Sequence, residues 1–367
     1  MNISEIISYW GYPDEVYDIV TKDGYILGLY RIPYGKTKKF NNTAQRLVVY
    51  LQHGLFTSAS SWISNLPNNS LGFILADAGY DVWLGNSRGT TWSRKHTYLK
   101  TDSKEFWSFS FDEMAKYDLP AFIDFIVNRT GQKKIFYIGH SQGTTIAFIT
   151  FSTIPKIAER IKIFFALAPV FSIKYLKSPF VKMAYKLKPV IKAFSGNKEF
   201  LSNTSFKRFI GSKLCPLKIF GVLCREFLFM IYGYDTKNLN MVRTNMFSSV
   251  NPALSVSLER LLHFFQLFNS DQLKAFDWGS PAQNLLHYNQ KESPVYNVSK
   301  MNVPTATWSG KNDYLADPDD VRILLSEITK SIYHKTISYY NHLDFLFGLD
   351  VYQKVYHDII DIMQANS

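Results

Sequence analysis

A serine within a Gly-x-Ser-x-Gly motif is the side chain of this sequence best placed for covalent chemistry. Residues 139–143 read Gly-His-Ser-Gln-Gly; they directly follow an apolar run, 135–138, and precede a stretch, 144–149, that predicts a helix. In this strand–turn–helix context the two glycines permit a tight turn that lifts the serine hydroxyl clear of the sheet edge. The motif therefore predicts a nucleophile at Ser141. The alternative is an ordinary turn between a strand and a helix.

A base and an acid that could activate this serine follow it along the chain. A serine hydroxyl is a poor nucleophile until a base accepts its proton, and an acid must orient that base. Asp313 closely follows an apolar run, 303–308, whereas Asp317 precedes a proline and a periodic apolar stretch, which predicts a helix N-cap. His342 lies just beyond the last predicted strand, 335–339, in the chain order typical of nucleophile elbows. We expect Asp313 and His342 to complete a triad with the serine.

Two backbone N–H groups must also point at the oxyanion of the tetrahedral intermediate. In an elbow architecture one comes from the residue after the nucleophile and the other from the loop after an early strand. These positions are Gln142 and Leu55, the latter in a His-Gly-Leu turn after the apolar run 46–52. We expect His140, inside the elbow, to pack against or orient its neighbours rather than to act as a second base.

The elements that must position these residues alternate between strand-like and helix-like runs. This pattern is typical of an α/β protein with a mostly parallel sheet covered by helices on both faces. Between residues 171 and 296 the alternation stops, and the chain is richer in Lys and Phe. The predicted organisation is therefore a core formed by 1–170 and 297–367, with a helical cap, 171–296, inserted into it.

Composition limits the classes of function. The 367 residues are 46% apolar and 19% charged, which indicates a globular chain. The 29 Phe, 23 Tyr and 7 Trp fit either an aromatic core or a site for large apolar ligands. The net charge is +11, but no nucleic-acid-binding motif is present, so no nucleic acid partner is expected. Residues 174–218 hold eleven Lys or Arg, which predicts either a solvated face or a surface for a lipid–water interface.

Several segment types are not expected from the sequence. No run reaches the roughly 18 apolar residues of a membrane helix. The first ten residues lack a basic region followed by an apolar one, so no signal peptide is expected. No P-loop and no His-Glu-x-x-His motif are present, so no metal and no organic cofactor are expected.

The two cysteines and the glycosylation sequons bear on the compartment. Cys215 and Cys224 are nine positions apart and could close a small disulfide loop or remain buried thiols; they do not match metal or redox spacing. Six Asn-x-Ser/Thr sequons are present, each weak alone, at Asn2, Asn41, Asn68, Asn128, Asn203 and Asn297.

The sequence resembles the acid lipase family of α/β-hydrolases over almost its whole length. Long runs carry the resemblance, among them Tyr-Trp-Gly-Tyr-Pro at 9–13 and further runs at 61–70, 75–83, 110–120 and 340–345. The resemblance implies an α/β-hydrolase fold with an inserted cap. It also implies hydrolysis of neutral lipid esters, triacylglycerols or sterol esters, at a lipid–water interface. It implies a secreted or lysosomal protein, although without a signal peptide an intracellular one is possible.

The resemblance also assigns roles by position. It implies a triad of Ser141, Asp313 and His342, with oxyanion donors at Leu55 and Gln142. It further implies a cap disulfide between Cys215 and Cys224 and glycosylated asparagines at Asn68 and Asn297. It also implies a lid at 203–232. Two alternatives to a lipase are a short-chain carboxylesterase and a lipid-binding paralogue with weak turnover. The lipid-binding alternative is kept because Lys311, in the loop that carries Asp313, stands where the family usually has glycine.

Overall fold

The structure is a computed structural model that describes residues 1–36, 45–195, 199–200, 218–235, 237–239 and 256–367. Its main feature is a nine-stranded sheet in the order β1-β2-β4-β3-β6-β7-β10-β11, with β5 paired to β2. The strands of this sheet are β1 (Glu15–Val20), β2 (Tyr25–Ile32), β3 (Val48–Gln52), β4 (Asp81–Gly85), β5 (Lys95–His96), β6 (Ile135–His140), β7 (Ile161–Leu167), β10 (Thr305–Gly310) and β11 (Ser331–Ile337).

The sheet is parallel from β4 to β11 and antiparallel at the N-terminal edge. The pairs β1–β2, β2–β4 and β2–β5 are antiparallel, and the other pairs are parallel. Every residue of β3, β4 and β6 is buried, as expected for central strands covered on both faces. The expected fold class, a mostly parallel α/β sheet, is therefore confirmed.

Helices connect and cover these strands. α2 packs on β4, α5 on β1, α6 on β6 and α15 on β10. The helices are α1 (Ile3–Tyr9), α2 (Leu71–Asp77), α3 (Lys104–Trp107), α4 (Phe111–Glu113), α5 (Leu119–Thr130), α6 (Gln142–Thr153), α7 (Pro155–Ala158), α8 (Pro179–Lys186), α9 (Lys188–Ser195), α11 (Lys218–Tyr232), α13 (Leu258–Gln266), α14 (Pro281–Tyr288), α15 (Pro318–Glu327), α16 (Asp344–Phe347) and α17 (His357–Ala365).

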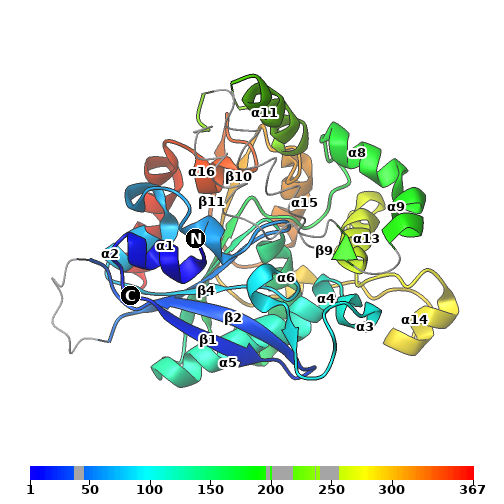
Figure 1. The fold of residues 1–367 in the computed structure, drawn as a ribbon, viewed down its shortest axis with the longest axis horizontal. Helices are drawn as coiled ribbons and strands as arrows, with labels where there is room; N and C mark the ends of the chain where they lie inside the picture. The colour runs from blue at the N-terminus through cyan, green and yellow to red at the C-terminus, as the bar shows by residue number, and fades with distance from the viewer. Residues whose placement is uncertain (37–44, 196–198, 201–217, 236, 240–255) are drawn as a thin grey trace.

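The chain between β7 and β10 is organised differently from the rest. Its described strands, β8 (Glu199–Phe200) and β9 (Val256–Ser257), pair with each other in a separate two-stranded sheet. Figure 1 shows α8, α9 and α13 gathered on one side of the molecule, with α11 nearby at the top. These features favour an inserted cap, although its boundaries at 171 and 296 stay a prediction. Of the expected lid, residues 203–217 lie outside the described residues.

Some predicted elements differ in position from the observed ones. The last strand, expected at 335–339, runs from Ser331 to Ile337. Its residues alternate in exposure because it is an edge strand, so no continuous apolar run marked it. The helical stretches near 110–130 and 350–363 each contain a π-helical segment, Met114–Asp118 and Tyr352–Tyr356.

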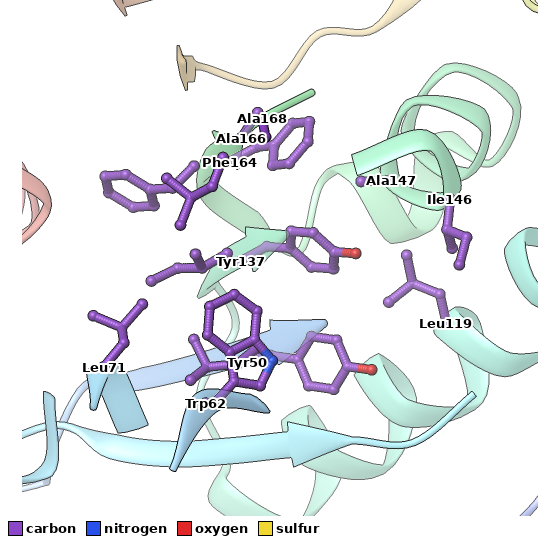
Figure 2. Close-up of a cluster of buried hydrophobic side chains, with 14 of the residues drawn as sticks. Tyr50, Trp62, Leu71, Leu119, Tyr137, Ile146, Ala147, Phe164, Ala166 and Ala168 are labelled. Atoms are coloured by element: carbon purple, nitrogen blue, oxygen red, sulfur yellow. The ribbon is translucent and has the colours of Figure 1, made fainter. Parts of the chain in front are cut away.

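Two tyrosines of the buried cluster in Figure 2 connect the core to polar groups near the elbow. Tyr50, on β3, lies beside Tyr137, on β6, with 5.6 Å between ring centroids, and both are fully buried. Their hydroxyls reach polar partners at the strand ends: Tyr137 Oη donates to Gly143 O at 2.7 Å, and Tyr50 Oη donates to Gln52 Oε1 at 2.6 Å. Since buried tyrosines need such a partner, the packing of the core also fixes the start of α6.

Candidate active site

The Gly-x-Ser-x-Gly motif forms the turn between β6 and α6. Ser141 has φ 55° and ψ −124°, a left-handed conformation that costs a non-glycine residue about 1–3 kcal/mol. Backbone hydrogen bonds hold it there: Ser141 N donates to Leu167 O at 3.0 Å, and Thr144 N donates to Ser141 O at 2.8 Å. A Cβ at Gly143 would lie 2.4 Å from Gln52 O, so only glycine fits this approach of α6 to β3.

The three residues expected to form a triad lie within hydrogen-bonding distance of one another. His342 Nε2 lies 2.7 Å from Ser141 Oγ, and His342 Nδ1 lies 2.8 Å from Asp313 Oδ2. Asp313 and His342 are each 1% exposed, and Ser141 is 8% exposed. Because the carboxylate can only accept, His342 Nδ1 carries a proton, which leaves Nε2 free to accept the proton of Ser141 Oγ.

The acid loop orients Asp313 through its backbone. Asp313 Oδ1 accepts from the N–H groups of Leu315 and Ala316 at 2.9 and 2.8 Å, so Oδ2 is left to face the histidine. Asp317 is the N-cap of α15, as predicted, and its Oδ1 accepts from Asp319 N at 3.0 Å. The two aspartates of this loop therefore have different roles: Asp313 faces the histidine, and Asp317 caps the helix.

The loop that carries His342, called the histidine loop below, is held by polar side chains on both sides. Asn341 Oδ1 accepts from Leu343 N at 2.8 Å, and Asn341 Nδ2 donates to Gly233 O at 2.8 Å. His140 Nε2 donates to the carbonyl oxygen of His342 at 2.9 Å. Burial lowers the pKa of His140 well below its usual value, so its ring is neutral. His140 orients the histidine loop, as expected, and is not placed as a second base.

Of the two expected oxyanion donors, Gln142 directly follows Ser141, and Leu55 belongs to a loop that passes beside it. Gln142 is the first residue of α6, a position where an N–H has no acceptor within the helix. Leu55 follows Gly54, whose hypothetical Cβ would lie 3.3 Å from Ser141 Oγ, so this loop passes beside the hydroxyl. The carbonyl oxygen of Gly54 lies 2.8 Å from His53 Nδ1 and 3.1 Å from Thr57 Oγ1. Since the C=O and N–H of a trans peptide point to opposite sides, these contacts fix the direction of the N–H of Leu55.

His53 is a positioning residue that the sequence did not reveal. Its Nε2 accepts from Ser87 N at 3.1 Å, so its proton is on Nδ1, where it donates to Gly54 O. Burial lowers the pKa of His53 to about 3, so the neutral form dominates at neutral pH. Only the His-Gly pair itself, at the end of a strand, could have suggested this role.

Replacing Gly54 with alanine is expected to lower kcat about a hundredfold, because the oxyanion donor would be displaced. The new Cβ would lie 2.8 Å from Ser141 Cβ and 3.2 Å from His140 O, so either the loop or the elbow must shift. Steady-state hydrolysis of a soluble p-nitrophenyl ester measures kcat, and thermal unfolding checks that the fold remains. An alanine variant with unchanged kcat would contradict this account of the loop.

A buried pair of carboxyl groups next to His342 was also not predicted. Asp344 is fully buried; its Oδ1 accepts from Asn238 Nδ2 at 2.8 Å, and its Oδ2 accepts from Asn341 N at 2.6 Å. Burial raises the pKa of Asp344 to about 9, and a hydrogen bond to Asp235 and the charge of Asp235 add to this rise. The protonated carboxyl of Asp344 thus connects the histidine loop to the segment after α11. Its place two residues after His342 was the only sequence signal.

The contribution of Asp344 to stability is expected to fall as pH rises between about 4 and about 9. Native Asp344 holds a proton that the unfolded chain releases near its ordinary pKa of 3.8, so its contribution is complete below that pH. The contribution is lost as pH rises toward the native pKa of about 9. Thermal unfolding midpoints from pH 5 to 8.5 measure the pH dependence, and the midpoint of Asp344→Asn should fall less, or rise more, with pH than that of the wild type. Asp319→Asn removes a half-exposed carboxylate and should leave the pH dependence unchanged.

The remaining sequence expectations lie on the periphery of this site. Asn68 and Asn297 are both exposed, as glycosylated asparagines must be. Cys224 lies in α11, whereas Cys215 lies outside the described residues, so the disulfide stays a prediction. Lys311 is exposed, and its N–H donates to Ile337 O at 3.0 Å.

Comparisons with known proteins show the family and the fold of the chain. A family model described as "Partial alpha/beta-hydrolase lipase region" matches residues 3–66, and one described as "alpha/beta hydrolase fold" matches residues 48–349. A solved structure of a soluble variant of monoglyceride lipase from Saccharomyces cerevisiae superimposes with a TM-score of 0.57. It is 16% identical and covers 97% of this chain and 99% of its own, a likeness that concerns the fold alone.

Curated relatives are much closer in sequence. Lipase member J of Homo sapiens is 73% identical over 366 residues, 100% of both chains. Gastric triacylglycerol lipase of Mus musculus is 57% identical over 99% of this chain and 91% of its own. Lysosomal acid lipase/cholesteryl ester hydrolase of Macaca fascicularis is 51% identical over the same shares. The chain therefore belongs to the α/β-hydrolase family, within the group that contains the gastric and lysosomal acid lipases.

Proposed function

We propose that this protein is a serine lipase that hydrolyses neutral lipid esters through an acyl-enzyme. The observation that carries the proposal is the hydrogen-bonded series Ser141–His342–Asp313 on a strained elbow, with distances of 2.7 and 2.8 Å. His342 Nε2 accepts the proton of Ser141 as Oγ bonds to the ester carbonyl carbon. The carbonyl oxygen takes the negative charge and receives hydrogen bonds from the N–H groups of Leu55 and Gln142.

Both halves of the reaction use the same proton carrier. When the intermediate collapses, the C–O bond to the alcohol breaks, and His342 gives its proton to the leaving oxygen. Water then attacks the acyl-enzyme while His342 accepts its proton. The second intermediate releases the fatty acid as Ser141 Oγ recovers a proton from His342. Asp313 orients the imidazole and stabilises its charged form in each half.

Exposed apolar side chains on the cap helices support action at a lipid–water interface. Apolar side chains are exposed on α8, α9 and α11, namely Met183, Val190, Val222, Leu223 and Phe227. Lysines are exposed beside them on α8 and α9, namely Lys182, Lys186 and Lys192. α8 packs against both α9 and α11, so these side chains belong to neighbouring elements. Apolar and basic groups together are typical of surfaces that lie on anionic interfaces. No described helix is long and apolar enough to cross a membrane.

The names of the relatives support the substrate class and the compartment. The gastric relative is named for triacylglycerol and the lysosomal one for cholesteryl esters. We therefore expect neutral lipid esters with long acyl chains, in a secreted or lysosomal setting. Glycans at Asn68 and Asn297 and a Cys215–Cys224 disulfide would fit that setting.

A series of p-nitrophenyl acyl esters and emulsified triolein tests the proposal. We expect activity that rises with acyl length and includes triolein. The same protein inactivated with a serine-directed phosphonate serves as the blank. Activity on short esters alone would favour the carboxylesterase alternative. No hydrolysis and no phosphonate labelling would favour the lipid-binding alternative, although the exposed position of Lys311 and the intact contact of Asp313 with His342 argue against it.

A further inference from the structure

A cap arginine is buried against the residue that follows the nucleophile. Arg260, in the first turn of α13, is 2% exposed, and its Nε donates to Gln142 Oε1 at 2.6 Å. Two neighbouring donors of this contact, Arg260 Nη2 and Gln142 Nε2, are buried and have no hydrogen-bond partner among the described residues. Buried donors without partners are rare because each one costs free energy.

The charge of this arginine is not balanced by a carboxylate in contact with it. Asp118 is the acid whose charge acts on Arg260, but Asp118 already forms an ion pair with Arg88 at 2.7 Å. Within the part of the chain that the structure describes, no ion pair of Arg260 is found. Burial lowers the pKa of Arg260 to about 9, so the guanidinium is still charged at neutral pH. A buried cation without a balancing carboxylate destabilises a fold, so its presence here calls for a functional reason.

The position of the charge indicates that use. Arg260 contacts the side chain of Gln142, one proposed oxyanion donor, and its charge also lowers the pKa of His53. His53 in turn holds the peptide that carries the other donor, Leu55 N–H. The cation therefore lies near both sides of the oxyanion site, in a region without solvent where electrostatic effects are strong.

We propose that Arg260 is a positioning residue that fixes Gln142 and supplies positive charge to the oxyanion site. The inference rests on the proposed serine hydrolase function. The negative charge that forms during acyl transfer would then be the counter-charge that Arg260 lacks in the resting protein. Because α13 belongs to the region between β7 and β10, the cap helix would contribute directly to the rate of reaction and not only to substrate fit.

Arg260→Met, Arg260→Lys and Arg322→Met provide the test. Arg322 is an exposed arginine on α15, so its replacement is a matched loss of charge away from the site. For Arg260→Met we expect kcat on p-nitrophenyl butyrate to fall about tenfold to a hundredfold, with KM nearly unchanged. An alkyl boronic acid, which forms an anionic tetrahedral adduct with serine, should bind more weakly by a similar factor. Lysine should recover part of kcat, and Arg322→Met should match the wild type.

Stability separates this role from a structural one. If the charge is kept for the reaction, Arg260→Met should have a thermal midpoint equal to or above that of the wild type, since methionine removes a buried charge. Unchanged kcat, or a loss of kcat that parallels a fall in the thermal midpoint, would overturn the inference. Both results leave an active wild type, whereas failure of the proposed function would abolish hydrolysis and phosphonate labelling in the wild type itself.

Discussion

Ser141→Ala should reduce kcat by about a million-fold, because no other group in the site can form the acyl-enzyme. The variant loses the hydroxyl that lies 2.7 Å from His342 Nε2, while the oxyanion donors stay in place. A residual rate of about a thousandfold over uncatalysed hydrolysis is therefore expected. Burst kinetics with a p-nitrophenyl ester would show whether an acyl-enzyme accumulates in the wild type and not in the variant.

The matched control for this result is Ser152→Ala. Ser152 lies near the end of α6, the helix that begins after Ser141, and its Oγ donates to backbone carbonyls of that helix. Its replacement should leave kcat unchanged. If Ser141→Ala kept more than a small fraction of the activity, and phosphonate labelling moved to another residue, the proposed nucleophile would be wrong.

Arg88→Met should lower the free energy of unfolding by about 3–5 kcal/mol, because it leaves a buried acid without its partner. The Arg88 side chain is 1% exposed; its Nη2 lies 2.7 Å from Asp118 Oδ1, and its Nη1 lies 2.6 Å from Asp23 Oδ2. The guanidinium also lies 4.0 Å from the centroid of the Tyr25 ring. Burial already raises the pKa of Asp118, and the charge of Arg88 opposes that rise. Urea unfolding monitored by tryptophan fluorescence measures the loss.

A control variant and a double mutant test whether the buried ion pair causes this loss of stability. Arg160→Met breaks a partly exposed ion pair with Asp124, so it should cost less than about 1 kcal/mol. Adding Asp118→Asn to Arg88→Met should recover part of the lost stability, because the buried charge is then removed. Equal losses for the two arginine variants would show that burial does not decide the value of the Arg88 pairs.

Much of the sheet could be predicted from the sequence because its central strands are buried on both faces. The run Ile161–Leu167 is apolar except for Lys162, and β7 has these same limits. The N-terminal hairpin β1–β2 was not predicted, since β1 is largely exposed: its residues alternate between exposed and half-buried, and only Ile19 is buried. The predicted limits of the last strand were wrong for the same reason. Edge strands depend on their neighbours more than on their own pattern.

The acid and the base of the triad could be selected because they follow strands in a fixed chain order. Asp317 was set apart from Asp313 by the proline that follows it, and the structure has that N-cap. The supporting groups could not be found in this way. His53, Asp344 and Arg260 lie 88, 203 and 119 positions from Ser141 along the chain, and at most a neighbouring residue hints at their roles.

The sequence by itself determined the parallel core, the elbow and the membership in the acid lipase group, because continuous apolar runs, glycine spacing and long matched segments are local properties. Only the tertiary structure decided which buried charges have partners. Among the described residues, it left Arg260 without an ion pair beside Gln142, protonated Asp344 next to the loop of His342, and gave Arg88 two carboxylates. Burial and partners are properties of the packed chain, since they depend on residues that meet only when distant elements pack together.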